Sequence, residues 1–101
     1  MNSIITATLK EISEELLIQL EELSSLMLSK KQIAVILEFN QEDFKELLKD
    51  EDDAPYIRFQ RGRLVQEAEV RKSIMELAKN GSSPAQAFAF KLIENAKMDD
   101  L

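Results

Sequence analysis

The chain has 101 residues, 45% of them hydrophobic, which is enough to fill one small core without metal ions or disulfides. It contains no cysteine and no histidine, so disulfides, thiol nucleophiles, zinc sites of the usual type and histidine-based triads are excluded. Two glycines and two prolines leave a composition that favours helices over strands. No apolar run approaches the roughly 20 residues of a membrane span. We therefore expect an all-α, non-enzymatic, cytoplasmic protein without a cofactor.

The formal net charge of −6 is unevenly distributed along the chain. Residues 1–53 contain 5 basic and 13 acidic residues, whereas residues 54–101 contain 8 basic and 6 acidic residues. An acidic chain is not typical of a strong general DNA-binding protein, because phosphate contact requires a cationic surface. A ring of weakly binding subunits can still use one local basic strip, so the charge only disfavours DNA binding.

The first predicted helix covers residues 4–28, because apolar residues recur there every three or four positions. These residues are Ile5, Leu9, Ile12, Leu16, Leu20, Leu23 and Met27, and Leu17, Ile18 and Leu26 widen the stripe. Such a broad stripe is consistent with a buried core helix, or with a helix that also packs against another subunit. Both interpretations stay open.

Two short helices are predicted next. Ser29 and Gln32 have the spacing of a capping box, which begins a helix over residues 30–38. Asn40 caps a second helix over residues 41–49, and the acidic run at residues 50–53 ends it. The expected buried side chains are Ile33, Ala34, Ile36 and Leu37 on the first helix and Phe44, Leu47 and Leu48 on the second.

A long helix is predicted over residues 55–79, since Pro55 suits the first turn of a helix and Gly62 is the only helix-breaking residue after it. One continuous helix is favoured, because an exposed glycine costs only about 1 kcal/mol. Its second half is expected to bury Val70, Ile74, Leu77 and Ala78.

The last predicted helix, residues 84–97, follows a stop at Asn80-Gly81 and is capped by Ser83, with Gln86 closing a capping box. One side carries Ala85, Phe88, Ala89, Leu92, Ile93 and Ala96. Phe90 lies outside that face and is expected to be exposed in a monomer.

The two short helices and the Phe39-Asn40 turn predict a helix-turn-helix, in which Ala34 allows close crossing and Phe44 holds the pair together. In a DNA-binding protein the second helix would enter the major groove and present Gln41, Lys45 and Lys49. Glu42 and Glu46 on the same side are unfavourable for phosphates. DNA contact and a purely structural helix pair are both compatible with this pattern.

Residues 56–63 form a stretch that combines aromatic and basic side chains. Arg58 and Arg61 share a helix face, and arginine suits phosphates. Alternatively Tyr56, Ile57 and Phe59 belong to the core and the arginines pair with the acidic run at residues 50–53. That acidic run lacks the ligand spacing of a calcium loop, so no metal site is expected.

The chain resembles the small terminase subunits of tailed bacteriophages over roughly residues 25–97. The resemblance lies in Leu28-Ser29-Lys30-Lys31-Gln32-Ile33-Ala34, Phe44, Tyr56, Arg61-Gly62-Arg63, residues 67–73 and the turn Leu77-Ala78-Lys79-Asn80-Gly81-Ser82-Ser83-Pro84-Ala85. It implies a homeodomain-like helix-turn-helix in residues 1–53 and an oligomerisation hairpin in residues 54–101. It also implies double-stranded viral DNA, the terminase large subunit and a homo-oligomeric ring as partners, in the host cytoplasm.

The expected site residues follow from these interpretations. For DNA binding they are Lys30, Lys31, Gln41, Lys45, Lys49, Arg58, Arg61 and Arg63. For oligomerisation they are Val70, Ile74, Leu77, Phe88, Phe90, Leu92 and Ile93. No catalytic or metal-binding residue is expected. The alternatives are an adaptor that binds only proteins, for which the stretch from Tyr56 to Arg63 would be the binding surface, or a helix-turn-helix transcription regulator.

Overall fold

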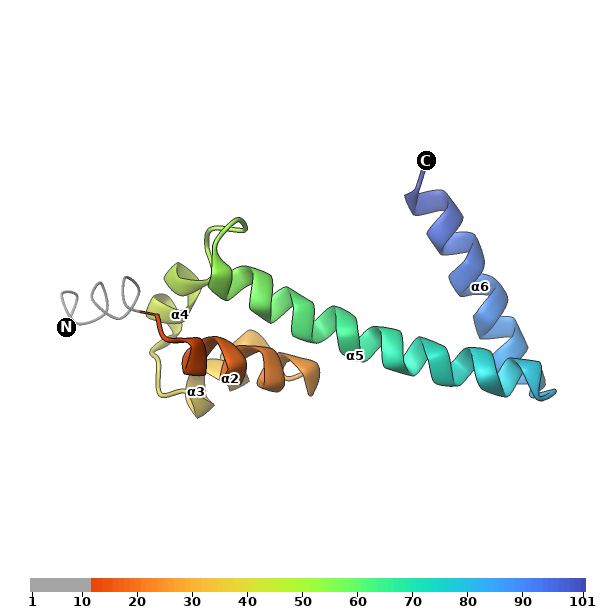
Figure 1. Ribbon diagram of the computed structural model, residues 1–101, viewed down its shortest axis with the longest axis horizontal. Helices are drawn as coiled ribbons and strands as arrows, with labels where there is room; N and C mark the ends of the chain where they lie inside the picture. The colour runs from red at the N-terminus through yellow and green to blue at the C-terminus, as the bar shows by residue number, and fades with distance from the viewer. Residues whose placement is uncertain (1–11) are drawn as a thin grey trace. The chain divides into compact units, whose positions relative to one another are not determined.

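The computed structural model describes residues 12–101, and all regular structure in this range is helical (Figure 1). The helices are α2 (Glu14–Ser25), α3 (Lys30–Ile36), α4 (Gln41–Leu47), α5 (Ala54–Lys79) and α6 (Ser83–Asp99). The expected all-α class is therefore confirmed for the described range. Residues 4–11 of the first predicted helix lie outside the described range. Within that range the helix begins only at Glu14, because Ser13 is extended and caps it, so the prediction of a helix through Ile12 and Ser13 is wrong. Among the described helices, none combines the length and apolar character needed to cross a membrane.

The chain divides into two compact units, Met1–Gln66 and Glu67–Leu101. The first unit contains α2, α3, α4 and the beginning of α5, and the second contains the remainder of α5 and α6. This division falls inside a helix, later in the chain than the expected boundary after residue 53. The helix α5 is continuous, as predicted.

Local side-chain caps begin the short helices where the sequence predicts them. The Gln32 amide donates to Ser29 Oγ at 3.1 Å and the Ser29 amide donates to Gln32 Oε1 at 3.0 Å, which completes the capping box of α3. Asn40 Oδ1 accepts from the Asp43 amide at 2.8 Å and caps α4. Each cap satisfies an amide that has no partner within its helix.

The helices α2, α3 and α4 all end earlier than predicted. Met27 has a φ of 62° and Glu38 a φ of 63°, in the left-handed region. Each of these residues directly follows a C-cap residue, Leu26 or Leu37, and a left-handed residue at that position terminates a helix. The predicted ends at residues 28 and 38 are therefore wrong, and α2 and α3 stop at Ser25 and Ile36. The predicted end at residue 49 is also wrong, because α4 stops at Leu47 with Leu48 as its cap.

The core of the first unit is formed by apolar side chains from four helices and the turn after α4. Its buried members are Leu17, Leu20, Ile33, Ala34, Phe44, Leu47, Leu48 and Phe59. Ile36 was expected to be buried but is exposed, because the early end of α3 places it at the helix terminus. The rings of Phe39 and Phe44 meet edge to face with centroids 5.8 Å apart, so the turn residue joins this packing.

Where α5 meets α2, the closest approach occurs at Gly62. A Cβ on Gly62 would overlap Ser24 Oγ and the Glu21 carbonyl oxygen. The sequence prediction treated Gly62 as an exposed glycine, whereas it is buried. Its missing side chain is what lets the two helix backbones touch.

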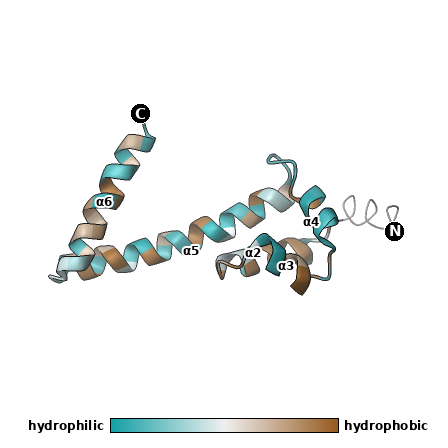
Figure 2. Ribbon diagram, turned by 180° about the vertical axis from the view of Figure 1, so that it is seen from behind, coloured by the Kyte–Doolittle hydropathy of each residue, from teal (hydrophilic) through white to brown (hydrophobic). Residues whose placement is uncertain are grey.

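The second unit has few buried side chains. Only Ala85 and Ala89 are buried there among the apolar residues, and hydrophobic and hydrophilic residues alternate along α5 and α6 (Figure 2). Val70 and Leu77 were expected to be buried but are about half exposed, at 52% and 55%. The predicted exposure of Phe90 is confirmed, but the predicted side of the last helix is not: Ala89 and Ile93 line a groove together with Phe90, and Phe88 does not line it.

The start of α6 differs by one residue from the prediction. Ser82, not Ser83, is the cap, and its Oγ accepts from the Ala85 amide at 3.4 Å. The expected capping box with Gln86 does not form, because the Gln86 side-chain amide donates to the Ala78 carbonyl at 3.1 Å. Gln86 thus joins α6 to the end of α5 across the turn at Gly81, whose φ is 100°.

Candidate nucleic-acid interface

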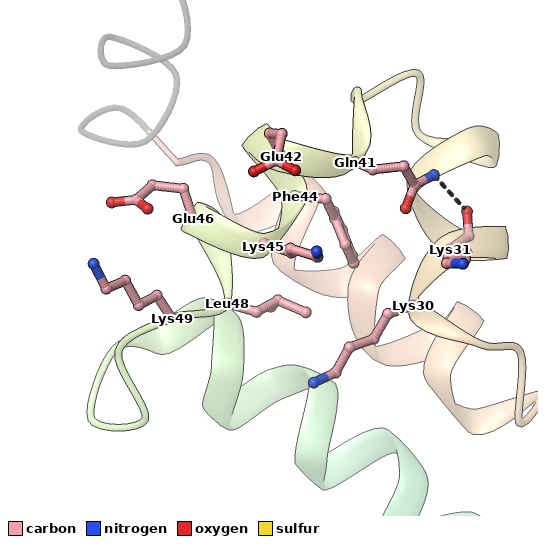
Figure 3. A pocket seen from close by; sticks show the side chains of 9 residues that line it. All are labelled: Lys30, Lys31, Gln41, Glu42, Phe44, Lys45, Glu46, Leu48 and Lys49. Atoms are coloured by element: carbon pink, nitrogen blue, oxygen red, sulfur yellow. Dashed lines mark hydrogen bonds between the residues drawn. The ribbon is translucent and has the colours of Figure 1, made fainter.

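A hollow of about 480 Å³ lies between the beginning of α3 and the length of α4 (Figure 3). Its lining residues are Lys30, Lys31, Gln41, Glu42, Phe44, Lys45, Glu46, Leu48 and Lys49. The buried Phe44 and Leu48 contribute the apolar part of this lining. Five of the eight expected DNA-binding residues therefore gather around one concave surface.

The caps explain why these side chains meet. Ser29 begins α3, so Lys30 and Lys31 occupy its first turn, and Asn40 begins α4 at Gln41. The Gln41 side-chain amide donates to the Lys31 carbonyl at 3.3 Å, which links the two helix starts directly (Figure 3). Lys45 lies on α4 and Lys49 follows its end, and both line the same hollow.

Gln41, an expected DNA-contacting residue, already uses part of its side-chain amide within the protein. A bidentate contact with adenine uses both the nitrogen and the oxygen of the side-chain amide. Here the side-chain nitrogen already donates a hydrogen bond to the Lys31 carbonyl. In the structure Gln41 therefore holds α3 and α4 together and leaves only its oxygen available as an acceptor.

The hollow is locally basic although the chain is acidic. Four lysines line it against two glutamates, Glu42 and Glu46. All six charged side chains are exposed, so dissolved salt screens their interactions. The net positive potential favours an anion such as phosphate, and the glutamates reduce its strength.

Arg58 is held inside the first unit by two carboxylates of α2. Its Nη1 lies 2.8 Å from Glu14 Oε2 and its Nε lies 2.8 Å from Glu21 Oε1. The hydrogen bonds to Glu14 and then Glu21 raise the pKa of Arg58 above its ordinary value. The alternative in which Arg58 pairs with the acidic run at residues 50–53 is wrong.

Arg63 contacts a backbone carbonyl and an aromatic ring, whereas Arg58 contacts carboxylates. Its Nη2 donates to the Leu28 carbonyl at 2.6 Å, and its guanidinium carbon lies 4.6 Å from the centroid of the Phe59 ring. Lys30 Nζ lies 5.6 Å from the same centroid. Because Leu28 and Lys30 flank the cap of α3, Arg63 braces the segment from which the hollow begins.

The three arginines of residues 56–63 thus have unequal exposure. Arg61 is the freest, with 66% of its side chain exposed and its Nε 3.9 Å from Glu21 Oε1. Phe59 is buried at 2% exposure, which confirms the core alternative for this ring, whereas Ile57 is exposed.

A second hollow, of about 410 Å³, runs along the exposed side of α5 in the first unit. It is lined by Glu51, Tyr56, Ile57, Gln60, Arg61, Leu64 and Val65. Ile57, Leu64 and Val65 are all exposed there. This apolar groove brings the Tyr56–Arg63 stretch together with two residues that the sequence analysis did not single out.

Sequence reasoning missed the role of Gly62 and Ser24, which set the contact between α5 and α2. The signal available was a glycine inside an otherwise strong helix pattern, which points to a close approach of another backbone. Glu14 and Glu21 were also missed, because nothing in the local pattern indicates Arg58 as their partner.

The expected oligomerisation residues all lie in the second unit and are accessible. Val70, Leu77, Phe88, Phe90 and Ile93 are exposed, and Ile74 and Leu92 are half-buried. Within residues 12–101 no three acidic side chains gather in a manner that would hold a metal ion. No protein-family model, curated protein or solved structure matches the chain.

Proposed function

We propose that this chain is a DNA-binding homo-oligomer of the phage small-terminase type, in which α3 and α4 act as a homeodomain-like helix-turn-helix. The observation that carries the proposal is the basic hollow, where Lys30, Lys31, Lys45 and Lys49 surround one concave surface. Lysine ammonium groups spread over two helices and the segment that follows them match the repeated charges of a phosphate backbone. The resemblance over residues 25–97 supplies the biological context.

Within this proposal the arginines divide into two roles. Arg61 lines the groove along α5 and not the basic hollow, and it is available for phosphate contact because its side chain is exposed and only loosely paired. Arg58 and Arg63 support the fold through Glu14, Glu21 and the Leu28 carbonyl. The DNA-contacting set therefore consists of the four lysines of the hollow together with Arg61.

Assembly compensates for the weak binding of a single subunit. Two glutamates dilute the positive charge of each hollow, so one subunit binds duplex weakly. Several subunits joined in one particle engage the same duplex with a high effective concentration. The exposed apolar side chains of the second unit, which we propose as an oligomerisation hairpin, supply the contacts for such a particle.

Regulation of a large motor subunit completes the proposal, and it rests on the resemblance to small terminase subunits. DNA binding by the hollow and assembly by the second unit are the two properties that such a regulator combines. The protein then positions viral DNA for a partner that carries the enzymatic activity.

The test is a measurement of duplex affinity by fluorescence anisotropy over a series of salt concentrations. We expect Lys31→Ala and Lys45→Ala each to flatten the slope of log K against log salt by about one unit per engaged subunit. Lys72→Ala removes the same charge from an exposed site in the second unit and is the matched control. Failure of the wild type to bind any duplex at low salt would refute DNA binding.

A protein-binding adaptor is the second candidate, and the apolar groove along α5 favours it. Exposed Ile57, Leu64 and Val65 lie together there, beside the half-buried Tyr56. Contiguous apolar surface of this kind marks interaction sites on proteins. The adaptor predicts no duplex binding at moderate salt and a loss of partner binding in the uncharged variant Leu64→Gln, whereas the DNA-binding proposal predicts unchanged duplex affinity in that variant.

A further inference from the structure

Helix α6 presents aromatic rings on two different sides. Phe88 and Phe90 are two residues apart, which corresponds to about 200° around a helix of 3.6 residues per turn. Both rings are exposed, at 59% and 66%. No single flat surface can therefore cover both of them.

On the Phe90 side, α6 and the end of α5 form a groove of about 430 Å³. It is lined by Met75, Ala78, Lys79, Gln86, Ala89, Phe90 and Ile93. The bond from the Gln86 side chain to the Ala78 carbonyl, 3.1 Å long, joins the two helices at this groove. The groove is chiefly apolar and open to a side chain from outside.

On the Phe88 side, the neighbours are Ala87 and Lys91, both from α6 itself. No residue of α5 lines this surface, so the Phe88 ring projects without a partner from the other helix. Each chain thus carries one projecting ring and one apolar groove, on different sides of α6. Its own Phe88 cannot enter its own groove, because the helix lies between them.

We propose that Phe88 of one copy inserts into the groove of the next copy, between Met75, Ala89 and Ile93. This inference rests on the homo-oligomer that the proposed function includes, and it specifies the contact. A second copy is the occupant because ring and groove occur in the same chain, and because Ala85 and Ala89 are the only buried apolar side chains in this unit. Insertion covers both apolar surfaces of every protomer that has a neighbour on each side.

Such a contact is head-to-tail, since the surface that donates the ring differs from the surface that accepts it. Head-to-tail contacts produce closed rings when the rotation between protomers closes, whereas a contact between identical surfaces stops at a dimer. The geometry of α6 therefore predicts a particle of more than two chains.

The experiment measures particle mass by light scattering for the full-length chain and two variants, without DNA. Phe88→Asp removes the ring and keeps the groove, whereas Ile93→Asp blocks the groove and keeps the ring. Both sites are exposed, so the monomer fold should tolerate the changes, which circular dichroism checks. Met98→Asp, at another exposed apolar site on α6, is the matched control and should keep the wild-type mass.

We expect the wild type to exceed a dimer, each variant alone to be a monomer, and an equimolar mixture of the two variants to form a dimer. In the mixture, the intact ring of one variant inserts into the intact groove of the other. Assembly ends at that dimer, because the remaining ring and the remaining groove are both disrupted. A wild-type particle of two chains, or a mixture that stays monomeric beside a larger wild-type particle, would overturn this contact while leaving the homo-oligomer intact. A monomeric wild type would overturn the contact and the homo-oligomer together, and duplex binding is measured separately.

Discussion

Gly62 of α5 lies directly against Ser24 of α2, so that even a methyl group on Gly62 would overlap the Ser24 hydroxyl. Ser24 is completely buried and its hydroxyl donates to the Glu21 carbonyl at 3.0 Å. This pair of small residues determines how closely α5 approaches α2. The close approach in turn brings Arg58 within reach of Glu21 and places Phe59 in the core.

The Gly62→Ala variant should be less stable than the wild type. An added Cβ must displace the Glu21 backbone as well as the Ser24 side chain, and such overpacking costs roughly 1–3 kcal/mol. The free energy of unfolding from urea titration measures the change. If Gly62 were exposed, the substitution would instead increase the free energy of unfolding, because alanine is favoured over glycine in a helix by about 1 kcal/mol.

Ser73→Ala on the same helix is the control for this variant, since Ser73 is exposed and the substitution changes helix propensity alone. We expect Ser73→Ala to be neutral or slightly stabilising. An equal gain in stability for Gly62→Ala would contradict the close contact of α5 with α2.

Removing the guanidinium of Arg58 should weaken the attachment of α5 to α2. Arg58→Gln loses both hydrogen bonds, to Glu14 and Glu21, and should lower the thermal unfolding midpoint. The difference from the wild type should shrink at 1 M salt, where the screening length is about 3 Å. Arg61→Gln is the matched control, because its nearest carboxylate oxygen is 3.9 Å away and its side chain is exposed. Equal effects of the two variants would contradict the arrangement.

Arg63 should act through the fold and not through phosphate contact. Arg63→Ala removes the bond to the Leu28 carbonyl and the stacking on Phe59, at a cost of roughly 1–3 kcal/mol in stability. The salt dependence of duplex affinity should stay at the wild-type slope, whereas Arg61→Ala should flatten it by about one unit per engaged subunit. A flattened slope in Arg63→Ala would assign this residue to the DNA surface instead.

The glutamates of the basic hollow should limit its affinity for duplex DNA. Glu46→Gln removes one negative charge beside Lys45 and Lys49 and should raise affinity at low salt, by up to roughly fivefold. Glu69→Gln, an exposed site on α5 outside the hollow, changes the net charge equally and is the control. Equal gains for both variants would show that only the total charge matters, and that the hollow is not the binding surface.

Several features of this protein follow from short stretches of sequence. The starts of α3 and α4 were predicted because a cap joins residues only three positions apart, Ser29 with Gln32 and Asn40 with Asp43. The gathering of Lys30, Lys31, Lys45 and Lys49 is a consequence of those starts and of the short connection between the helices. The single helix α5 was predicted for the same reason, since helix propensity is a local property.

Other features were decided by contacts between residues far apart in the chain. The partners of Arg58 lie 44 and 37 positions away, so no local pattern indicates them. Gly62 is buried because α2 packs against it. Val70 and Leu77 are exposed because α6 covers little of α5. Sequence by itself determined the helical class and where most helices begin, because caps and periodicity act over one or two turns. Only the tertiary structure decided which charged and small residues meet, because such pairs form when helices pack and are defined by distance in space.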